Sequence, residues 1–234
     1  MQVSLLHELN AARSGRRTCM VVTDLGAGKS ELIFPGLDHG WPDIAQNITD
    51  HFASGASGEV VAGERRFFLR PHIPPLRIIV VGAVHIAQAL GSIAATLGYE
   101  MVIIDPRTLF ASEDRFPATR LITDWPKVAL PTLSVDRATA CVMLTHDPKL
   151  DDDALRYVLP LDCFYIGALG SRKTHAKRVA RLLGEGVAQE QIDRIHAPIG
   201  LAIGALTPEE IALSIVAEIV AAWRAERVAA KERQ

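Results

Sequence analysis

The sequence is poor in cysteine, and the few cysteines that it has form no pattern. There are three of them, an odd number, at the widely separated positions Cys19, Cys141 and Cys163. Such spacing fits neither a disulfide framework nor a Cys-x-x-Cys metal site. The sequence therefore favours a reducing compartment, and we expect a cytoplasmic protein.

An excess of charge and long hydrophobic runs are lacking as well. The chain carries 25 basic and 27 acidic residues, a net charge of −2, so its charge gives no reason to expect nucleic acid or an anionic membrane surface as a partner. No apolar run reaches the roughly 18 residues of a membrane span. The first residues show no basic leader followed by an apolar stretch, so we expect neither a membrane segment nor a signal peptide.

Apolar residues, in contrast, make up 49% of the 234 residues, which is enough for a substantial core. The N-terminal part distributes them over short segments. The elements expected there are a helix, two strands, a second helix and a hairpin, at residues 5–13, 19–23, 31–34, 42–53 and 59–70. We therefore expect a small α+β domain over residues 1–70. Pro71, Pro74 and Pro75 follow within a short stretch, which predicts a linker over 71–76.

From residue 77 to residue 234, apolar strands alternate with helical segments. The expected strands lie at residues 78–81, 101–105, 140–144 and 163–166. The expected helices lie at residues 85–97, 151–159, 172–183 and 188–195. A last helix begins at Thr207, with a capping box and a proline in its first turn. This alternation with buried strands predicts an α/β domain with a Rossmann-like, doubly wound and mostly parallel sheet.

The first strand of this domain runs through a glycine turn into its helix. Gly82, Ala83, Val84 and His85 form the junction, in the layout of a dinucleotide-binding unit. Backbone N–H groups at the start of the helix, together with the helix dipole, favour an anion there. The junction is therefore a candidate cofactor site.

Two residues at and just after the end of the next strand would complete a nucleotide site. Asp105 could accept a hydrogen bond from a ribose 2′-hydroxyl, which favours NAD, whereas Arg107 could pair with the 2′-phosphate of NADP. Val84, however, stands where the nucleotide-binding pattern has its second glycine, the residue that lets the backbone approach a pyrophosphate. The alternative is a scaffold in which Gly82 only makes the turn, and both interpretations stay open.

A second strand–glycine–helix junction contains Gly167, Gly170, Ser171, Arg172 and Lys173. Ser171 is expected to cap the helix, and the two cations in the first turn oppose the helix dipole. This unfavourable local arrangement is understandable if an anion lies between the N–H groups and the two side chains. The junction is therefore a candidate site for a phosphate or a pterin phosphate, and the alternative is a solvated basic face.

Two further loops belong to the candidate site. The loop with Pro198, Gly200 and Gly204 precedes the last helix, and such loops often close over the crevice of an open α/β sheet; a plain connector is the alternative. His146 and Asp147 follow a buried strand, at the edge where such sheets bind ligands. His146 could act as an acid, a base or a metal ligand, but no second histidine lies at metal-ligand spacing. We therefore predict no metal site and assign no catalytic residue.

Several segments carry motifs that occur together in one protein family. The strongest is the run YIGALGSRK at residues 165–173. It is accompanied by RIHAPIGLAIGA at 194–205, TPEEIA at 207–212, GAVHIAQA at 82–89, DPR at 105–107 and THD at 145–147. With these motifs in this order, the chain resembles the xanthine dehydrogenase accessory protein family (XdhC/CoxI) over residues 77–224.

The resemblance implies a role in the maturation of molybdenum hydroxylases, such as xanthine dehydrogenase or carbon monoxide dehydrogenase. Members bind the molybdenum cofactor (molybdopterin, a pterin that carries a phosphate), support its sulfuration and deliver it to the apo-enzyme. The implied partners are the apo-hydroxylase, a cysteine desulfurase and a second copy of the chain. A non-catalytic accessory protein is the first hypothesis, and the alternatives are an NAD(P)-dependent oxidoreductase and a partner-binding module without a ligand.

The N-terminal part departs from the family pattern. Members usually carry a GSxPRxxGAKM stretch and a GGCxE stretch with a cysteine, and residues 1–70 contain neither. Cys19 lies in a strand-like run and does not follow two glycines. If the family's cysteine holds the molybdenum end of the cofactor, a partner protein would have to supply it.

Overall fold

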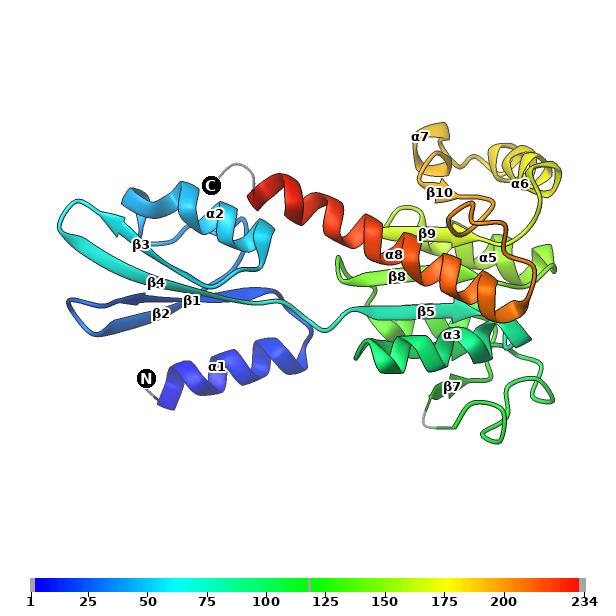
Figure 1. The fold of residues 1–234 in the computed structure, drawn as a ribbon, viewed down its shortest axis with the longest axis horizontal. Helices are drawn as coiled ribbons and strands as arrows, with labels where there is room; N and C mark the ends of the chain where they lie inside the picture. Colours follow the sequence, from blue (N-terminus) through cyan, green and yellow to red (C-terminus); the bar gives the residue numbers. More distant parts are fainter. Residues whose placement is uncertain (1–2, 118, 232–234) are drawn as a thin grey trace. The chain divides into compact units, whose positions relative to one another are not determined.

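The computed structural model describes residues 3–117 and 119–231 of the chain. The chain forms two compact units, a first one that comprises Met1–Pro74 and Arg224–Gln234 and a second one over Pro75–Trp223. The N-terminal unit is built on a four-stranded sheet and the second unit on a six-stranded sheet (Figure 1).

The N-terminal unit is an antiparallel sheet with a helix on each face. Its elements are α1 (Val3–Ser14), β1 (Cys19–Asp24), β2 (Lys29–Ile33), η1 (Pro42–Ile44), α2 (Ala45–Ser54), β3 (Gly58–Ala62) and β4 (Arg65–His72). The strands pair in the order β2-β1-β4-β3. Alternate residues of β1 point to opposite faces, so Cys19 and Val21 pack with α1, whereas Met20 and Val22 pack with α2. The small α+β fold predicted for this part is confirmed.

Strand β4 runs further than the sequence indicates, because it includes Pro71 and His72. Pro71 pairs with Met20 of β1, whereas β3 begins at Gly58, opposite Leu69, and does not extend to Pro71. At Pro71, β4 therefore has a neighbouring strand on one side only, which is where a sheet tolerates a residue without an N–H. Residues 73–76, which follow, lie outside regular structure.

The second unit contains a parallel sheet with helices on both faces. Its strands are β5 (Arg77–Val81), β6 (Glu100–Ile104), β7 (Arg120–Ile122), β8 (Thr139–Met143), β9 (Tyr165–Ala168) and β10 (Ile195–His196). Its helices are α3 (His85–Thr96), α4 (Pro126–Ala129), η2 (Leu130–Leu133), α5 (Pro148–Val158), α6 (Arg172–Gly184), α7 (Gln189–Ile192) and α8 (Pro208–Lys231). The strand order is β10-β9-β8-β5-β6-β7 with parallel pairing throughout. This is the order of a Rossmann sheet, with the first strand at its centre, so the predicted fold class is confirmed.

Both faces of this sheet are covered, and its central strands are buried along their whole length. All residues of β5 and β8 are buried, as expected for a doubly wound sheet. Helices α3 and α8 cover one face, and α4, α5 and α6 pack against the other (Figure 1). The helices thus leave the carboxyl ends of the strands and the loops that follow them as the place for a site.

Helix α5 begins earlier than the sequence indicates. The sequence predicts a start at residue 151, but α5 begins at Pro148. The Asp147 side chain accepts a hydrogen bond from the Lys149 backbone N–H at 2.9 Å and so caps the helix. A proline at the first helical position suits this arrangement, because that position needs no N–H donor.

The prediction of a helix over residues 188–195 is wrong in its second half. Helix α7 ends at Ile192, and Ile195 instead pairs in parallel with Ile166 of β9. A two-residue strand at the edge of a sheet leaves no periodic pattern that the sequence could show.

Within the described residues, no helix is both long enough and apolar enough to cross a membrane.

Candidate functional site

The predicted site residues lie at the carboxyl ends of five strands. The junction after β5 holds Gly82–His85, and the segments after β6, β8, β9 and β10 hold the remaining candidates. Because all strands are parallel, these segments meet at one edge of the sheet, which is the ligand-binding edge of open α/β folds. The contacts of each segment show which of its hydrogen-bond donors, acceptors and charges are already engaged within the protein and which could bind a ligand.

The glycine turn after β5 fits tightly against its neighbours. Gly82 has a φ of +114°, a backbone conformation that favours glycine. A Cβ atom at Gly82 would lie 2.6 Å from the Cγ2 atom of Thr145. The tight approach of β5 to the segment after β8 therefore requires glycine at this position.

A hydrogen bond joins this turn to Asp105 at the end of β6. The Ala83 backbone N–H donates to Oδ2 of Asp105 at 2.8 Å. Arg107 donates to the same carboxylate from its backbone N–H (2.9 Å), Nε (2.9 Å) and Nη2 (2.8 Å). Asp105 is fully buried. Neither its carboxylate nor the Ala83 N–H is directed toward a ligand.

The pKa of Asp105 reflects this environment. Burial alone would raise the pKa, but the hydrogen bonds from Arg107 and from the Ala83 N–H outweigh it and hold the pKa below its ordinary value. The carboxylate is thus charged and paired internally. In this geometry Asp105 does not serve as the acceptor for a ribose hydroxyl that the nucleotide interpretation requires, and Arg107 is engaged by Asp105.

Val84 and His85 lie at the start of α3. Val84 precedes α3 in an extended conformation and gives the helix no side-chain cap. His85 is exposed and lines a pocket of about 530 Å³ formed by residues of α3 and the start of α8, including Ser92 and Glu209. The structure therefore separates His85 from the other residues predicted around the glycine turn.

The segment after β8 is organised by the buried hydroxyl of Thr145. Its Oγ1 donates to Oδ1 of Asp151 at 2.7 Å and accepts from the Asp147 backbone N–H at 3.1 Å. Asp151 itself is almost completely buried. Burial raises the pKa of Asp151 to about 7, against the opposing effects of the hydrogen bond from Thr145 and the charge of Arg178.

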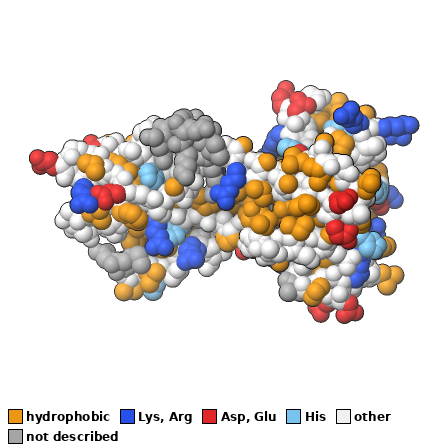
Figure 2. All heavy atoms as spheres, in the orientation of Figure 1, with side chains coloured by type: hydrophobic (Ala, Val, Ile, Leu, Met, Phe, Trp, Pro, Cys, Tyr) orange, Lys and Arg blue, Asp and Glu red, His pale blue; other side chains and the backbone are white. Residues whose placement is uncertain are grey.

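The junction after β9 is capped as the sequence predicts. Ser171 is the N-cap of α6, and its Oγ accepts from the Thr174 backbone N–H at 3.2 Å. Gly170 has a φ of +129°. Arg172 and Lys173 are exposed in the first turn. Figure 2 shows Lys and Arg side chains gathered over α6.

A pocket lies between α5 and α6, and we refer to it as the α5–α6 pocket. Its volume is about 250 Å³. It is lined by His146, Pro148, Asp151, Asp152, Lys173, Thr174, Lys177, Arg178 and Arg181. Four of these side chains are cationic and two are acidic, so the lining favours an anion.

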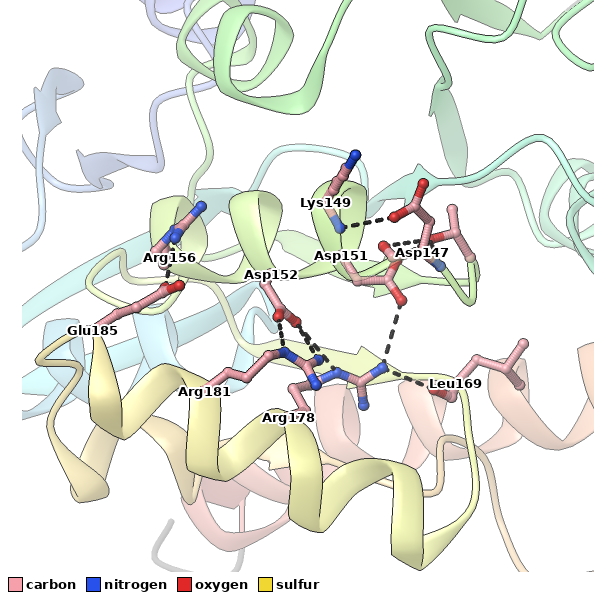
Figure 3. A network of polar contacts seen from close by, with 10 residues as sticks. Asp147, Lys149, Asp151, Asp152, Arg156, Leu169, Arg178, Arg181 and Glu185 are labelled. Carbon is pink, nitrogen blue, oxygen red and sulfur yellow. Dashed lines mark hydrogen bonds and ion pairs between the residues drawn. The ribbon is translucent and has the colours of Figure 1, made fainter.

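Ion pairs join the two helices along this pocket, as Figure 3 shows. Arg181 donates to the Asp152 carboxylate from Nε (2.5 Å) and from Nη2 (3.1 Å). Arg178 Nη2 lies 3.5 Å from Oδ2 of Asp151 and donates to the Leu169 carbonyl at 3.0 Å. Asp152 is thus paired by two hydrogen bonds, whereas Asp151 and Arg178 meet at a longer distance.

The structure brings only some of the predicted residues to this pocket. His146 and Lys173 line it, and Asp147 caps the helix beside it. Gly170, Ser171 and Arg172 do not line it. Reasoning from the sequence did not assign to the site the five other charged side chains of the lining: Asp151, Asp152, Lys177, Arg178 and Arg181. A signal did exist for some of them, because Lys173, Lys177 and Arg181 follow one another at helical i, i+4 spacing.

The loop after β10 is fixed to α8 and contributes nothing to the lining of the pocket. Glu218 accepts from the Gly200 N–H (2.8 Å) and from Tyr165 Oη (2.5 Å), and its Oε1 lies 3.1 Å from His196 Nδ1. Burial and the Glu218 carboxylate raise the pKa of Tyr165. Pro198 and Gly204 lie in the same loop and are exposed.

One of the predicted glycines has a packing role here. A Cβ atom at Gly167 on β9 would lie 2.5 Å from the Cδ1 atom of Ile199. Gly167 thus lets the loop after β10 pack onto the strand.

Among the described residues, no group of three or more His, Cys, Asp or Glu side chains is arranged to hold a metal ion.

Comparison with known proteins is consistent with this architecture. Residues 78–219 match the family model of the XdhC Rossmann domain. A crystal structure described as a xanthine dehydrogenase from Bacillus halodurans superposes with a TM-score of 0.67 over 95% of this chain and 66% of that one, at 23% identity. At this identity the likeness shows the fold alone.

Two curated relatives carry functional names. The chain is 34% identical over 181 residues to a probable xanthine dehydrogenase subunit of Bacillus subtilis, covering 77% of this chain and 53% of the relative. It is 32% identical over 146 residues to the molybdenum cofactor insertion chaperone PaoD of Escherichia coli, covering 62% of this chain and 40% of the relative. The chain thus spans about half or less of the length of the curated relatives that it matches. The family-model match covers more than half of the chain, and the chain belongs to the XdhC family.

Proposed function

We propose that the protein is an accessory protein that binds the molybdenum cofactor as cargo, supports its sulfuration and delivers it to a molybdenum hydroxylase of the xanthine dehydrogenase or carbon monoxide dehydrogenase type. Membership of the XdhC family and the name of the relative PaoD support a role in cofactor maturation. The proposal makes the protein a carrier and assigns no reaction to its own side chains.

The observation that carries the proposal is the contrast between the two glycine junctions. At the junction after β5, the Ala83 N–H and Arg107 occupy the Asp105 carboxylate, so a dinucleotide would lack this N–H donor and its ribose acceptor there. The junction after β9 opens beside the cationic α5–α6 pocket. A pterin with a single phosphate fits this arrangement better than a dinucleotide does.

Within the proposal, each group has a defined task. The four cationic side chains of the α5–α6 pocket serve the charged end of the cargo, and His146 also lines this pocket. The cationic lining orients the cargo by its charged end. The bound cofactor would supply molybdenum chemistry to the hydroxylase that receives it.

None of the three cysteines is placed to supply the sulfur for sulfuration. Cys19, Cys141 and Cys163 are all buried, with at most 3% of their surface exposed. A sulfur transfer needs an accessible thiolate, and none of these thiols meets this condition in the folded state. We therefore propose a cysteine desulfurase as a partner, beside the apo-hydroxylase and a second copy of the chain. Three unpaired thiols suit the cytoplasm as the site of action.

A direct test uses the full chain and purified molybdenum cofactor. The protein is incubated with the cofactor, passed over a desalting column and then mixed with a cofactor-free xanthine dehydrogenase. We expect the cofactor to co-elute with the protein and the hydroxylase to gain activity faster than with free cofactor. Calorimetry with NAD and NADP tests the oxidoreductase alternative. Micromolar NAD binding together with failure to retain the cofactor would overturn the proposal.

A further inference from the structure

The α5–α6 pocket contains a buried arginine whose hydrogen-bonding capacity is only partly used. Arg178 lies on α6 and is 3% exposed. Its Nη2 donates to the Leu169 carbonyl and faces Asp151. Its Nε and Nη1, in contrast, have no hydrogen-bond partner among the described residues. Figure 3 shows the guanidinium of Arg178 between the two acids of α5 and Leu169.

Unpartnered donors in a buried cation are unfavourable, because the group has lost water without gaining a replacement. The nearest carboxylate to Nε belongs to Asp152, at 4.0 Å, which is beyond hydrogen-bond length. Asp152 already accepts two hydrogen bonds from Arg181. The protein's own groups therefore leave two donors of Arg178 for another acceptor.

The surrounding charges fit the same kind of acceptor. Lys173 and Lys177 line the pocket from the exposed side of α6, four residues apart and on one face of the helix. Asp152 is neutralised by Arg181, so the cations that remain to be balanced are Lys173, Lys177 and Arg178, against Asp151 alone. A doubly charged anion would balance them. The planar fork of an arginine also suits the geometry of phosphate oxygens.

The size of the pocket limits the ligand further. About 250 Å³ is less than the roughly 300–1,000 Å³ of a pocket for a whole cofactor. It is enough for a phosphate group whose ester part leaves the pocket. A second pocket, of about 460 Å³, shares Pro148, Asp152 and Arg181 with the first and gives the ester part room.

We propose that the α5–α6 pocket binds the phosphate group of a phosphate monoester, with Arg178 as its central donor and Lys173 and Lys177 around it. The inference deepens the proposed function and rests on it for the identity of the natural ligand, the phosphate of the cofactor. Binding of a phosphate monoester as such can be measured independently of the cofactor.

The experiment is calorimetry of the full chain with phenyl phosphate and with inorganic phosphate, at low ionic strength. Lys177→Ala removes a lysine that lines the pocket. Arg172→Ala is the matched control, because Arg172 is exposed on the same helix, outside the pocket, and its loss changes the net charge equally. Arg178→Lys keeps the charge but removes the fork.

We expect Lys177→Ala to weaken binding by about 10-fold and Arg178→Lys by at least as much, as for the loss of a charged hydrogen bond. Arg172→Ala should change binding by less than about 2-fold. Absence of binding by the unmodified chain would overturn the proposal. Equal weakening by Lys177→Ala and Arg172→Ala would also overturn it, because it would show a solvated basic face. Lys177→Ala needs no buried substitution, so the test stands even if the Arg178 variant fails to fold.

A cofactor-transfer assay on the same variants separates this inference from the proposed function. Loss of both phosphate binding and cofactor retention in Lys177→Ala supports both. If Lys177→Ala loses phosphate binding but retains the cofactor unchanged, the cofactor binds elsewhere. This result would overturn the assignment of the pocket to the phosphate of the cofactor, while the carrier function stands. Phosphate binding by a protein that retains no cofactor supports the pocket and overturns the carrier function.

Discussion

The backbone N–H of Ala83 donates a hydrogen bond of 2.8 Å to the buried carboxylate of Asp105. In a nucleotide-binding Rossmann fold, an acid in this place accepts from the ligand's ribose. Here the acid at the end of β6 instead ties down the glycine turn after β5. Arg107 completes the arrangement with three further hydrogen bonds.

Replacement of this acid should cost stability rather than ligand affinity. Asp105→Asn keeps the shape of the side chain but removes the charge that Arg107 pairs with, so we expect the free energy of unfolding to fall by about 2 kcal/mol. Urea unfolding followed by circular dichroism measures the loss. Phosphate binding should change little, because the α5–α6 pocket does not include Asp105. A variant of unchanged stability that no longer binds phosphate would contradict both expectations.

The raised pKa of Asp151 predicts an unusual dependence of stability on pH. In the unfolded chain an aspartate loses its proton near pH 4, whereas folded Asp151 keeps it up to a pKa of about 7. Between these values the folded state binds the extra proton. The contribution of Asp151 to stability is therefore greatest below about pH 4 and is lost as the pH rises to about 7, by at most about 1.4 kcal/mol per pH unit.

The measurement compares urea unfolding at pH 5 and pH 7 for the unmodified chain and for Asp151→Asn. The asparagine cannot titrate, so the part of the slope due to this residue should disappear. His146→Gln serves as the control substitution at a second side chain that lines the pocket. An Asp151→Asn chain that keeps the full slope would show that another group causes it.

Gly82 and Gly98 offer a matched pair of substitutions. Both have positive φ, +114° and +70°, so alanine is strained at each. A Cβ atom at Gly98 would meet nothing within 4 Å, whereas one at Gly82 would come within 2.6 Å of Thr145. We expect Gly98→Ala to cost about 1 kcal/mol and Gly82→Ala about 3 kcal/mol. Equal midpoints in urea would mean that Thr145 moves aside without cost.

Glu218 fixes the loop between β10 and α8, and its replacement should release that loop. In Glu218→Gln, the carboxylate that accepts from Gly200 and Tyr165 becomes a neutral amide, which is a weaker acceptor. We expect the amide of Gly200 to exchange its hydrogen about 10-fold faster. Hydrogen-exchange mass spectrometry of the peptide over 197–206 measures this. Glu209→Gln, at an exposed position in the first turn of α8, should leave the exchange rate unchanged.

Local patterns in the sequence predicted the local structure well. Thr207 and Glu210 form the expected capping box, since Thr207 Oγ1 accepts from the Glu210 N–H and Oε2 of Glu210 accepts from the Thr207 N–H. Ser171 caps α6 as expected. These contacts join residues three apart, so their spacing is visible in the sequence.

Contacts between distant segments could not be predicted in the same way. Ala83 and Asp105 are 22 residues apart, and Arg178 and Asp151 are 27 apart. The sequence showed a basic helix but not which side of it faces α5. That side depends on how α6 packs on the sheet, and this packing buries Arg178 and leaves Arg172 outside the pocket. The proposed anion site therefore centres on the second turn of α6 and not on the start of the helix.

The bond between Ala83 and Asp105 bears on the proposed carrier function, which requires the protein to release what it binds. In many cofactor proteins the ligand completes the fold, and its loss destabilises them. In this chain the carboxylate of Asp105 accepts from the glycine turn, so no ligand is needed to satisfy the Ala83 N–H. Release of the cargo by the proposed carrier therefore breaks no hydrogen bond of this N–H.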